Sequence, residues 1–219
     1  MKYMDENQLE HKLREIAVVP VAVLEEEETV LPTAKALCDG GLPAIEITFR
    51  TAIAAKAIAQ IKKELPDMLI GAGTVLTPKQ VNAATDAGAD FLVSPGLNLR
   101  TLNAAKERGI PMIPGICTPT EAEAAIEQGL HLVKFFPAEA AGGLAMIKAM
   151  SAPYQMLSFM PTGGISMDNL EKYLSFSKIA ACGGSFMLSK KLLQDRDYAQ
   201  ITALSKQAAD LAAKVRKGV

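Results

Sequence analysis

The sequence has no tryptophan and few of the residues that most often carry nucleophilic or metal chemistry. It has two histidines, His11 and His131, and three widely separated cysteines, Cys38, Cys117 and Cys182. A catalytic cysteine normally needs a histidine partner, and a metal site needs several ligands close together. Neither pattern is present in the sequence, so we expect no metal, no cofactor and no cysteine nucleophile. The cysteines lie in apolar surroundings and are expected to be reduced core thiols, as in cytoplasmic proteins.

Long apolar runs are also missing. None reaches the ~18 residues that a membrane-spanning helix needs, and Met1–Leu13 is charged and lacks the apolar core of a signal peptide. Basic and acidic residues nearly balance, 23 against 24, with no basic stripe interleaved with aromatic residues. We therefore expect a cytoplasmic protein that acts on a small molecule and binds neither membranes nor nucleic acid.

What the chain does contain is one repeated pattern: a helical segment ends near glycine or proline, and a short apolar strand follows at once. The first strand is expected within Ile16–Leu24, and the alanine-rich segments between strands have helical spacing. Eight such strands are expected in 219 residues, which predicts a single-domain (β/α)8 TIM barrel, with a doubly wound open sheet as the alternative. The later strands are expected within the segments 41–48, 66–73, 88–95, 109–115, 129–136, 154–161 and 176–183.

The same pattern gives the domain organisation. No linker or low-complexity segment divides the 219 residues, so a single domain is expected. Residues 1–15 include a short amphipathic helix, residues 16–193 form the barrel, and residues 197–219 form a final helix with a polar face. In such a barrel, catalytic groups lie at the C-terminal ends of the strands, and a phosphate often lies after the last two.

Lys134 is the most unusual residue among these strands. It lies in the apolar segment Leu130–Glu139, which reads as a buried strand stopped by Pro137. A buried charge is costly unless it is paired, and a lysine that is neutral at pH 7 is a nucleophile. We therefore predict that Lys134 forms a Schiff base with a carbonyl substrate. The alternative is a lysine that ends the strand and reaches solvent or a structural carboxylate.

The second strand ends in Glu46-Ile-Thr-Phe-Arg50. Side chains alternate along a strand, so Glu46, Thr48 and Arg50 share a face, and the apolar residues between them face the helices. Glu46 could then move protons at the barrel mouth, and Arg50 could bind a carboxylate. The alternative is that these two residues only pair with one another.

Glycines mark other strand ends. Gly71-Ala-Gly-Thr74 allows a close backbone approach and offers a hydroxyl, or is only a tight turn. Pro161-Thr-Gly-Gly164 and Cys182-Gly-Gly-Ser185 expose backbone N–H groups where a barrel often binds phosphate. Gly142-Gly143, after the sixth strand, fits a plain loop or an addition to this anion site.

In this order, the motifs resemble the family of 2-keto-3-deoxy-6-phosphogluconate (KDPG) aldolases, bifunctional enzymes that also cleave 4-hydroxy-2-oxoglutarate (KHG). The resemblance covers about residues 16–193. It implies a class I aldolase on a (β/α)8 barrel, usually a homotrimer, that releases pyruvate. One departure is Phe186, where the family often has tryptophan. The motifs that carry the resemblance are Glu46–Arg50, Gly71–Val75, Val93–Gly96, Lys134–Glu139, Pro161–Gly164 and Gly183–Ser185.

The resemblance also implies a role for each matching residue. Lys134 matches the Schiff-base lysine and Glu46 the general acid/base, while Arg50 and Thr74 match groups around the pyruvate carboxylate. The remaining matches are to the pocket wall (Pro95 and Phe136), to a position beside the phosphate (Thr162) and to the phosphate-binding groups (Gly163, Gly164, Gly184 and Ser185).

Three other functions remain open at this point. The related 6-phosphogalactonate aldolases differ in one substrate stereocentre and tend to have an apolar residue at the position of Thr162, which favours the gluconate substrate here. Phosphosugar isomerases and epimerases also combine a phosphate site with a glutamate, but they do not need a neutral lysine within a strand. A catalytically silent phosphosugar-binding protein would lack a catalytic group, and none is missing.

Overall fold

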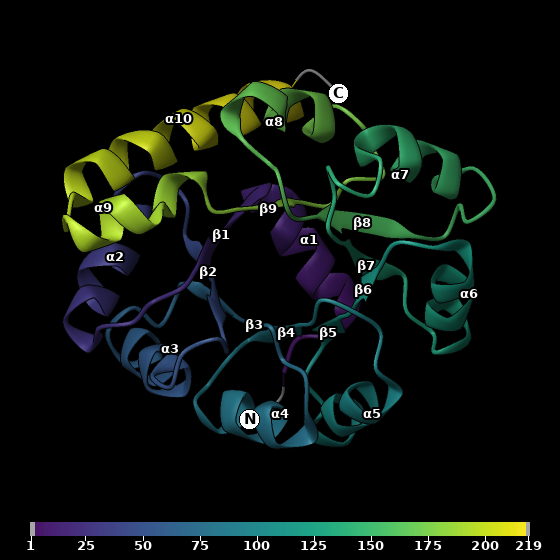
Figure 1. Cartoon of the computed structure of the whole chain (residues 1–219), viewed down its shortest axis with the longest axis horizontal. Helices are drawn as coiled ribbons and strands as arrows, with labels where there is room; N and C mark the ends of the chain where they lie inside the picture. The colour runs from purple at the N-terminus through teal and green to yellow at the C-terminus, as the bar shows by residue number, and fades with distance from the viewer. Residues whose placement is uncertain (1–2, 218–219) are drawn as a thin grey trace.

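The computed structural model describes residues 3–217 and has alternating strands and helices along its whole length. Most of the strands are buried along their full length, because helices cover the outer side of the curled sheet (Figure 1). The strands are β1 (Val18–Ala22), β2 (Ala44–Thr48), β3 (Leu69–Gly73), β4 (Phe91–Val93), β5 (Met112–Ile113), β6 (Gly115–Ile116), β7 (Leu132–Phe135), β8 (Ser158–Pro161) and β9 (Cys182–Gly184).

The helices follow the strands in the order that the sequence pattern predicts. Thr77 and Thr118 cap two of them, each with a proline at the start of the helix. The helices are α1 (Glu6–Ile16), α2 (Glu27–Asp39), α3 (Ala54–Glu64), α4 (Pro78–Asp86), α5 (Leu99–Arg108), α6 (Pro119–Glu127), α7 (Gly143–Ser151), α8 (Met167–Leu174), the short 3-10 turn η1 (Phe186–Leu188), α9 (Lys190–Gln194) and α10 (Tyr198–Lys217).

All strand pairings are parallel, in two sheets. One has the order β5-β4-β3-β2-β1-β9 and the other the order β6-β7-β8. Only Pro114, which has no backbone N–H to donate, separates β5 from β6, so the expected fifth strand is recorded as two. Two isolated parallel bridges, Phe159↔Ile179 and Thr162↔Gly183, join β8 to the segment that contains β9. The fold is thus a single α/β domain with a curled parallel sheet.

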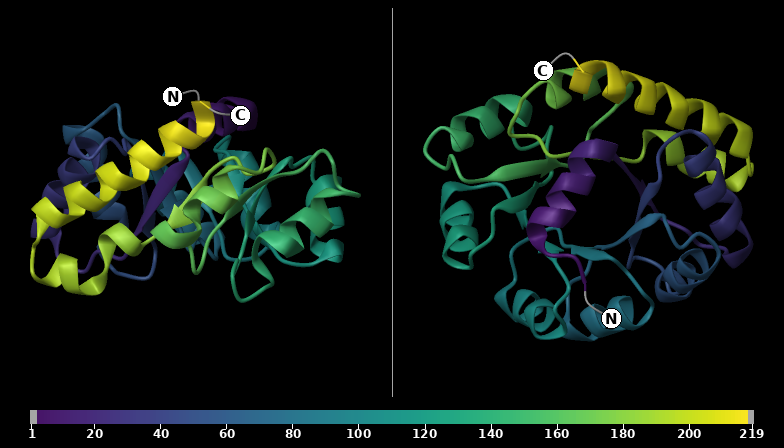
Figure 2. Two further views of the ribbon diagram at one scale, coloured as in Figure 1. Left: turned by 90° about the horizontal axis from the view of Figure 1, so that it is seen from above. Right: turned by 180° about the vertical axis from the view of Figure 1, so that it is seen from behind.

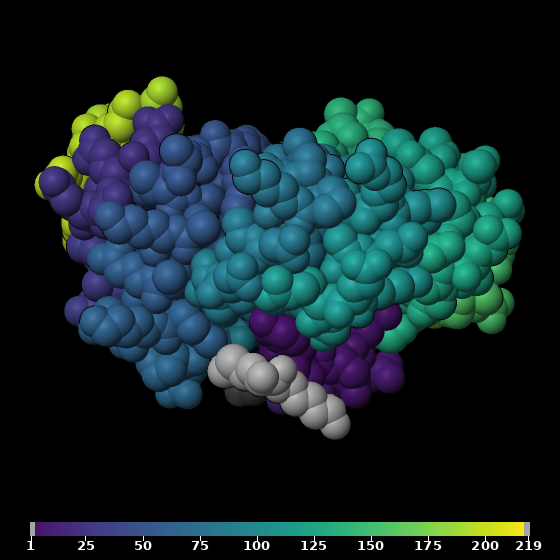
Figure 3. Space-filling view, turned by 90° about the horizontal axis from the view of Figure 1, so that it is seen from below, coloured from purple at the N-terminus to yellow at the C-terminus, as the bar shows by residue number. Residues whose placement is uncertain are grey.

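Two apolar cores follow from the alternation of side chains along the strands. The outer core lies between strands and helices and includes Ile45, Ile47 and Val133. The inner core lies inside the curled sheet and includes Leu132 and Met160. Leu9 and Leu13 of α1 belong to this inner core, so the first helix covers one end of it, as the view from behind shows (Figure 2). In the space-filling view, atoms of this N-terminal segment lie at the surface along one side of the molecule (Figure 3).

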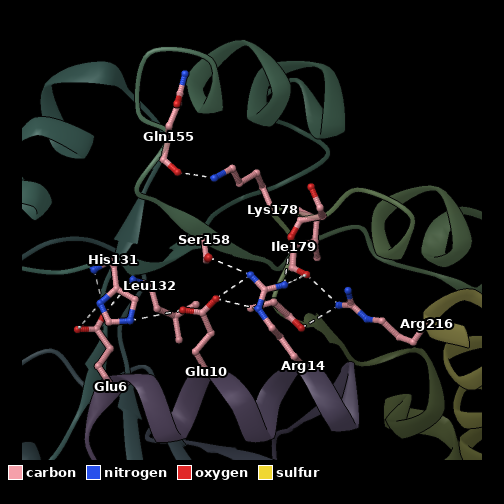
Figure 4. Close-up of polar contacts among 12 residues, drawn as sticks. Glu6, Glu10, Arg14, His131, Leu132, Gln155, Ser158, Lys178, Ile179 and Arg216 are labelled. Carbon is pink, nitrogen blue, oxygen red and sulfur yellow. Dashed lines mark hydrogen bonds and ion pairs between the residues drawn. The ribbon is translucent and has the colours of Figure 1, made fainter. Parts of the chain in front are cut away.

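Polar contacts fix α1 in this position (Figure 4). Glu6 accepts hydrogen bonds from the backbone amides of His131 and Leu132, at 3.0 and 2.7 Å. Arg14 donates to the Ser158 hydroxyl at 3.0 Å and to the Ile179 carbonyl at 3.2 Å. Because Leu132 and Ser158 begin their strands, α1 closes the N-terminal end of the sheet and leaves the C-terminal ends of the strands as the open mouth.

The two ends of the chain agree with the predicted helices within a few residues. Asp5 caps α1 at Gln8, so the helix begins at Glu6. The final helix, predicted over 197–219, is α10, and residues 218–219 of that prediction lie outside the described part. Within residues 3–217, no helix is long and apolar enough to span a membrane.

The expectation of three core thiols is only partly right. All three cysteines are free, but only Cys182 is buried. Burial raises its pKa well above the ordinary value, while Arg216 acts in the opposite direction. Cys38 and Cys117 are half-exposed because they lie near the ends of their elements, at the C-terminus of α2 and just after β6.

Candidate active site

Lys134 lies in β7 with its side chain toward the inside of the curled sheet. Leu132, two residues earlier, belongs to the inner core, whereas Val133 and Phe135 belong to the outer core. Lys134 is only 6% exposed. Its Nζ lies 3.5 Å from Oε1 of Glu46, so the lysine does not reach open solvent and has a single carboxylate partner among the described residues.

Glu46 lies in β2 and is 1% exposed. Its carboxylate fits there because Gly73 has no side chain: a Cβ added at Gly73 would lie 2.7 Å from Cγ and 2.8 Å from Cδ of Glu46. The second carboxylate oxygen, Oε2, is buried and has no hydrogen-bond partner among residues 3–217. A buried, unpaired carboxylate oxygen is costly in a purely structural role, and it can accept a proton or a hydrogen bond from a bound molecule.

The rest of the second strand follows the predicted alternation. Ile45 and Ile47 lie in the outer core, and the buried Thr48 hydroxyl donates to the Ala22 carbonyl at 3.0 Å. Arg50 is exposed in the turn that follows β2. Within the described chain, the carboxylate of Glu46 pairs with Lys134 and not with Arg50, so the structure does not support the alternative of a Glu46–Arg50 pair.

Thr74, Pro95 and Phe136 lie around the same strand ends. Thr74 directly follows β3 and has a φ of 57°, which is a strained conformation for a β-branched residue and one that occurs mainly at functional sites. Phe136 places its ring centroid 5.2 Å from Nζ of Lys134. Pro95-Gly96 packs directly on Gly115, where an added Cβ would lie 2.9 Å from the Gly96 nitrogen, and Gly115 pairs in register with Lys134.

The residues predicted to bind the phosphate lie close together at the C-terminal ends of β8 and β9. The bridge between Thr162 and Gly183 places Thr162-Gly-Gly164 beside Gly183-Gly-Ser185. Gly163 and Gly164 have φ values of 100° and 80°, which residues other than glycine rarely adopt. Among the hydrogen bonds of residues 3–217, neither glycine amide is a donor, so both N–H groups are free to bind an anion.

A cavity of about 310 Å³ adjoins this region. It lies between the segment after β1 and the η1–α9 segment, with Ser185 at its edge and Val21, Leu24 and Leu188 among the apolar residues of its wall. Neither Lys134 nor Glu46 lines this cavity. No group of three or more histidine, cysteine, aspartate or glutamate side chains in residues 3–217 is arranged to hold a metal ion.

Sequence reasoning missed two residues of this region. Gly73 was expected only to allow a close backbone approach or a tight turn, whereas in the structure it makes the space for Glu46. Tyr173 was not singled out, yet its hydroxyl donates a hydrogen bond to Glu139, the last residue of the Lys134–Glu139 motif. The first contact depends on the register between β2 and β3, in which Gly73 lies opposite Thr48, and the sequence does not give that register. The second joins distant segments and has no local signal.

A buried amine and a buried carboxylate at the mouth of a parallel α/β sheet are typical of enzymes that form Schiff bases. A family model for KDPG and KHG aldolases matches residues 9–204. The chain belongs to this family of aldolases.

Individual relatives agree with the family match. The chain is 47% identical to a 2-dehydro-3-deoxy-phosphogluconate aldolase of Treponema pallidum, over 91% of this chain and 95% of that protein. It is 45% identical to the KHG/KDPG aldolase of Escherichia coli K12, over 88% and 91% of the two chains. The KDPG aldolase of Legionella pneumophila, with pyruvate captured as a covalent carbinolamine, superposes with a TM-score of 0.87 at 39% identity, over 90% and 96%.

Proposed function

We propose that this protein is a class I aldolase that cleaves KDPG to pyruvate and glyceraldehyde 3-phosphate, and KHG to pyruvate and glyoxylate. The observation that carries the proposal is the buried contact of 3.5 Å between Lys134 Nζ and Glu46 Oε1. The relatives in Treponema pallidum and Escherichia coli are named for the same substrates. The carbinolamine in the Legionella pneumophila aldolase is the adduct that an amine forms with the ketone of pyruvate, before water leaves to give a Schiff base.

The first half of the reaction uses Lys134. Its neutral amine attacks the C2 ketone of the substrate, and loss of water gives an iminium ion. The iminium withdraws electrons from the C3–C4 bond, so that bond can break without a metal ion. The ring of Phe136 lies over this amine, with its centroid 5.2 Å from Nζ, and forms part of the wall around it.

The second half uses Glu46. Its carboxylate takes the proton of the C4 hydroxyl, directly or through a water molecule, while the C3–C4 bond breaks and the aldehyde leaves. The remaining enamine takes a proton at C3, and hydrolysis releases pyruvate and free Lys134. The unpaired Oε2 of Glu46 is the atom available for these transfers, because Oε1 faces the lysine.

The groups around this pair are proposed to hold the two ends of the substrate. Arg50 and Thr74 bind the pyruvate carboxylate, and Pro95 and Phe136 form the pocket wall. The amides of Gly163 and Gly164, together with Gly184 and the Ser185 hydroxyl, bind the phosphate, with Thr162 beside them. The support is that each follows the C-terminal end of a strand or lies near it, and that the amides of Gly163 and Gly164 have no other acceptor in residues 3–217.

We also infer that the two sheets act as one (β/α)8 barrel, formed by residues 16–193 of a single domain that spans 1–219. The bridges between β8 and the β9 segment support this closure on one side, and the short break at Pro114 supports it on the other. The protein is further proposed to be a cytoplasmic homotrimer without a cofactor, in keeping with its three free cysteines and with the usual assembly of the family.

The gluconate substrate is favoured over its galactonate epimer by Thr162. Its hydroxyl is buried and has no hydrogen-bond partner within the described residues, so a substrate hydroxyl or phosphate oxygen can pair with it. A phosphosugar isomerase would not need the lysine. No observation specifically favours the galactonate substrate or a phosphosugar isomerase.

The proposal is tested by steady-state cleavage of KDPG, of its C4 epimer and of KHG, with pyruvate release as the readout. We expect KDPG and KHG to be cleaved and the epimer to be a poorer substrate. Ser185→Ala should raise KM for KDPG and leave KM for KHG unchanged. Equal effects on both substrates would place the phosphate elsewhere, and absence of cleavage of all three would refute the function.

A further inference from the structure

Glu139 ends the Lys134–Glu139 motif, and the proposed reaction gives it no role. Its backbone amide donates to the Gly163 carbonyl at 3.0 Å, and the preceding amide, of Ala138, donates to the Thr162 carbonyl at 2.8 Å. The segment after β7 therefore runs along the turn that carries the proposed phosphate-binding amides.

The side chain of Glu139 makes a second contact with this turn. A Cβ added at Gly164 would lie 2.7 Å from both Cβ and Cγ of Glu139. The aliphatic stem of Glu139 thus packs against Gly164, where no larger residue fits. Gly164 itself has a positive φ and a free amide, so the orientation of that amide depends on what supports the turn.

The carboxylate end of Glu139 is fixed at a separate place. It accepts a hydrogen bond from the hydroxyl of Tyr173, in α8. Its Oε1 lies against Gly143, the first residue of α7, where an added Cβ would be 2.9 Å away. The positive end of the helix dipole favours an anion at that position. Glu139 therefore spans from α7 and α8, which lie next to one another around the sheet (Figure 1), to the Gly163-Gly164 turn.

Tyr173 is well suited to hold this carboxylate. It is fully buried, at 0% exposure, and a buried tyrosine hydroxyl needs a hydrogen-bond partner. Burial first, and then the hydrogen bond and the charge of Glu139, raise the pKa of Tyr173 far above its ordinary value. The hydroxyl of Tyr173 consequently remains a hydrogen-bond donor throughout the neutral range.

We propose that Glu139, held by Tyr173, is a positioning residue that sets the Gly163-Gly164 turn and so determines the affinity for the phosphate of the substrate. This inference rests on the proposed function and deepens it. It predicts an effect on phosphorylated substrates only, because the Lys134–Glu46 pair does not depend on this turn for its contact. A role confined to satisfying the buried Tyr173 hydroxyl would alter stability without this selectivity.

The test compares Tyr173→Phe, Glu139→Ala and Glu139→Gln with the parent enzyme in steady-state cleavage of KDPG and KHG. The first two variants should raise KM for KDPG by roughly tenfold to 150-fold, the factor expected for one lost hydrogen bond to a charged group. Glu139→Gln retains both the stem and an acceptor oxygen, and should restore KM to within about twofold of the parent. For KHG, kcat and KM should stay near the parent values in all three.

The chain offers a matched control. Tyr154 donates to Glu123 at 2.9 Å in a second tyrosine–glutamate pair, which joins α6 to the segment after α7 on the exposed surface. Tyr154→Phe and Glu123→Ala should leave both KM values unchanged. Thermal unfolding of every variant separates a loss of folding from a loss of phosphate binding.

Equal changes of KM for KDPG and KHG, or no change for either in Tyr173→Phe and Glu139→Ala, would overturn the positioning role. Borohydride trapping of pyruvate in the same variants separates this failure from failure of the proposed function. Trapping on Lys134 with an unchanged KM for KDPG would remove only the role of Glu139, whereas absence of trapping in the parent protein would remove the aldolase mechanism itself.

Discussion

At the scale of single residues, the proposed mechanism depends on one buried lysine–glutamate pair inside the sheet. Burying a lysine and a glutamate costs several kcal/mol for each ion unless the geometry repays it. Their contact of 3.5 Å leaves one oxygen of Glu46 without a partner in residues 3–217. Such an incomplete pair is poor as a structural element and suitable for proton transfer, which is why we assign Glu46 the role of general acid/base.

Glu46→Gln tests this assignment. The amide keeps the size of the side chain but cannot take a proton from the C4 hydroxyl, so kcat for KDPG should fall by roughly 10²–10⁴-fold, while substrate still binds. Turnover is measured by pyruvate release and binding by calorimetry with pyruvate. A variant with parental kcat would show that a different group moves the proton.

Gly73→Ala tests whether the position of that carboxylate matters. The added methyl group would lie 2.7 Å from Cγ of Glu46 and would push the side chain from its place beside Lys134. Small displacements of a catalytic group can reduce turnover by about 10²-fold, so kcat should fall by roughly tenfold to a hundredfold. Gly96→Ala, which meets no heavy atom within 4 Å, is the control for the substitution itself. Equal kcat values in the two variants would contradict the packing argument.

The sequence predicted Lys134 and Glu46 because strand alternation is a local property. In both strands, the apolar neighbours lie in the outer core and the charged residue faces inward. The sequence could not predict that Gly73 makes room for Glu46, or that Tyr173 holds Glu139. Tyr173 and Glu139 are 34 positions apart and meet only through the packing of α8. The sequence also left open whether Glu46 pairs with Arg50, which depends on the turn after β2.

At the scale of elements, the helix–strand order followed from the sequence, and the exceptions have identifiable causes. The fifth strand is divided at Pro114, which cannot donate to the ladder. The bounds of the short segments η1 and α9, between β9 and α10, could not be read from the sequence. Three to five residues are too few to show a helical period.

The first helix provides a test at this scale. Arg14 joins α1 to β8 and to the Ile179 carbonyl, besides its pair with Glu10. Arg14→Ala should lower the free energy of unfolding by about 1–3 kcal/mol, since carbonyl and hydroxyl acceptors lose a charged donor. Lys12→Ala, at an exposed position of the same helix, is the control and should change it by less than about 0.5 kcal/mol. Urea unfolding measures the free energy of both variants. Equal changes in the two would mean that α1 stabilises the fold only through the packing of its leucines.

At the scale of the whole molecule, the curled sheet explains how distant segments form one site. Lys134 lies in β7 and Glu46 in β2, and these strands belong to two different sheets. Their side chains nevertheless contact one another inside the curled sheet, at 3.5 Å. The first helix fills the N-terminal end of the interior with Leu9 and Leu13. We therefore propose that substrate enters from the C-terminal side, where Thr74, Pro95 and the two glycine pairs lie.

The proposed assembly is also tested at this scale. Size-exclusion chromatography with light scattering should give a mass three times that of the 23.3 kDa chain. Dilution of the sample shows whether this mass depends on concentration. A mass equal to that of one chain at every concentration would contradict the homotrimer, and would leave the assignments within the chain unaffected.

The central claim, that Lys134 forms a Schiff base, is tested most directly by reduction with sodium borohydride in the presence of pyruvate, followed by peptide mass mapping. If Lys134 forms the Schiff base, the parent protein should carry a stable pyruvyl adduct on Lys134. Lys134→Ala should show neither adduct nor cleavage. An adduct on another lysine, or the absence of any adduct in an active protein, would contradict the claim.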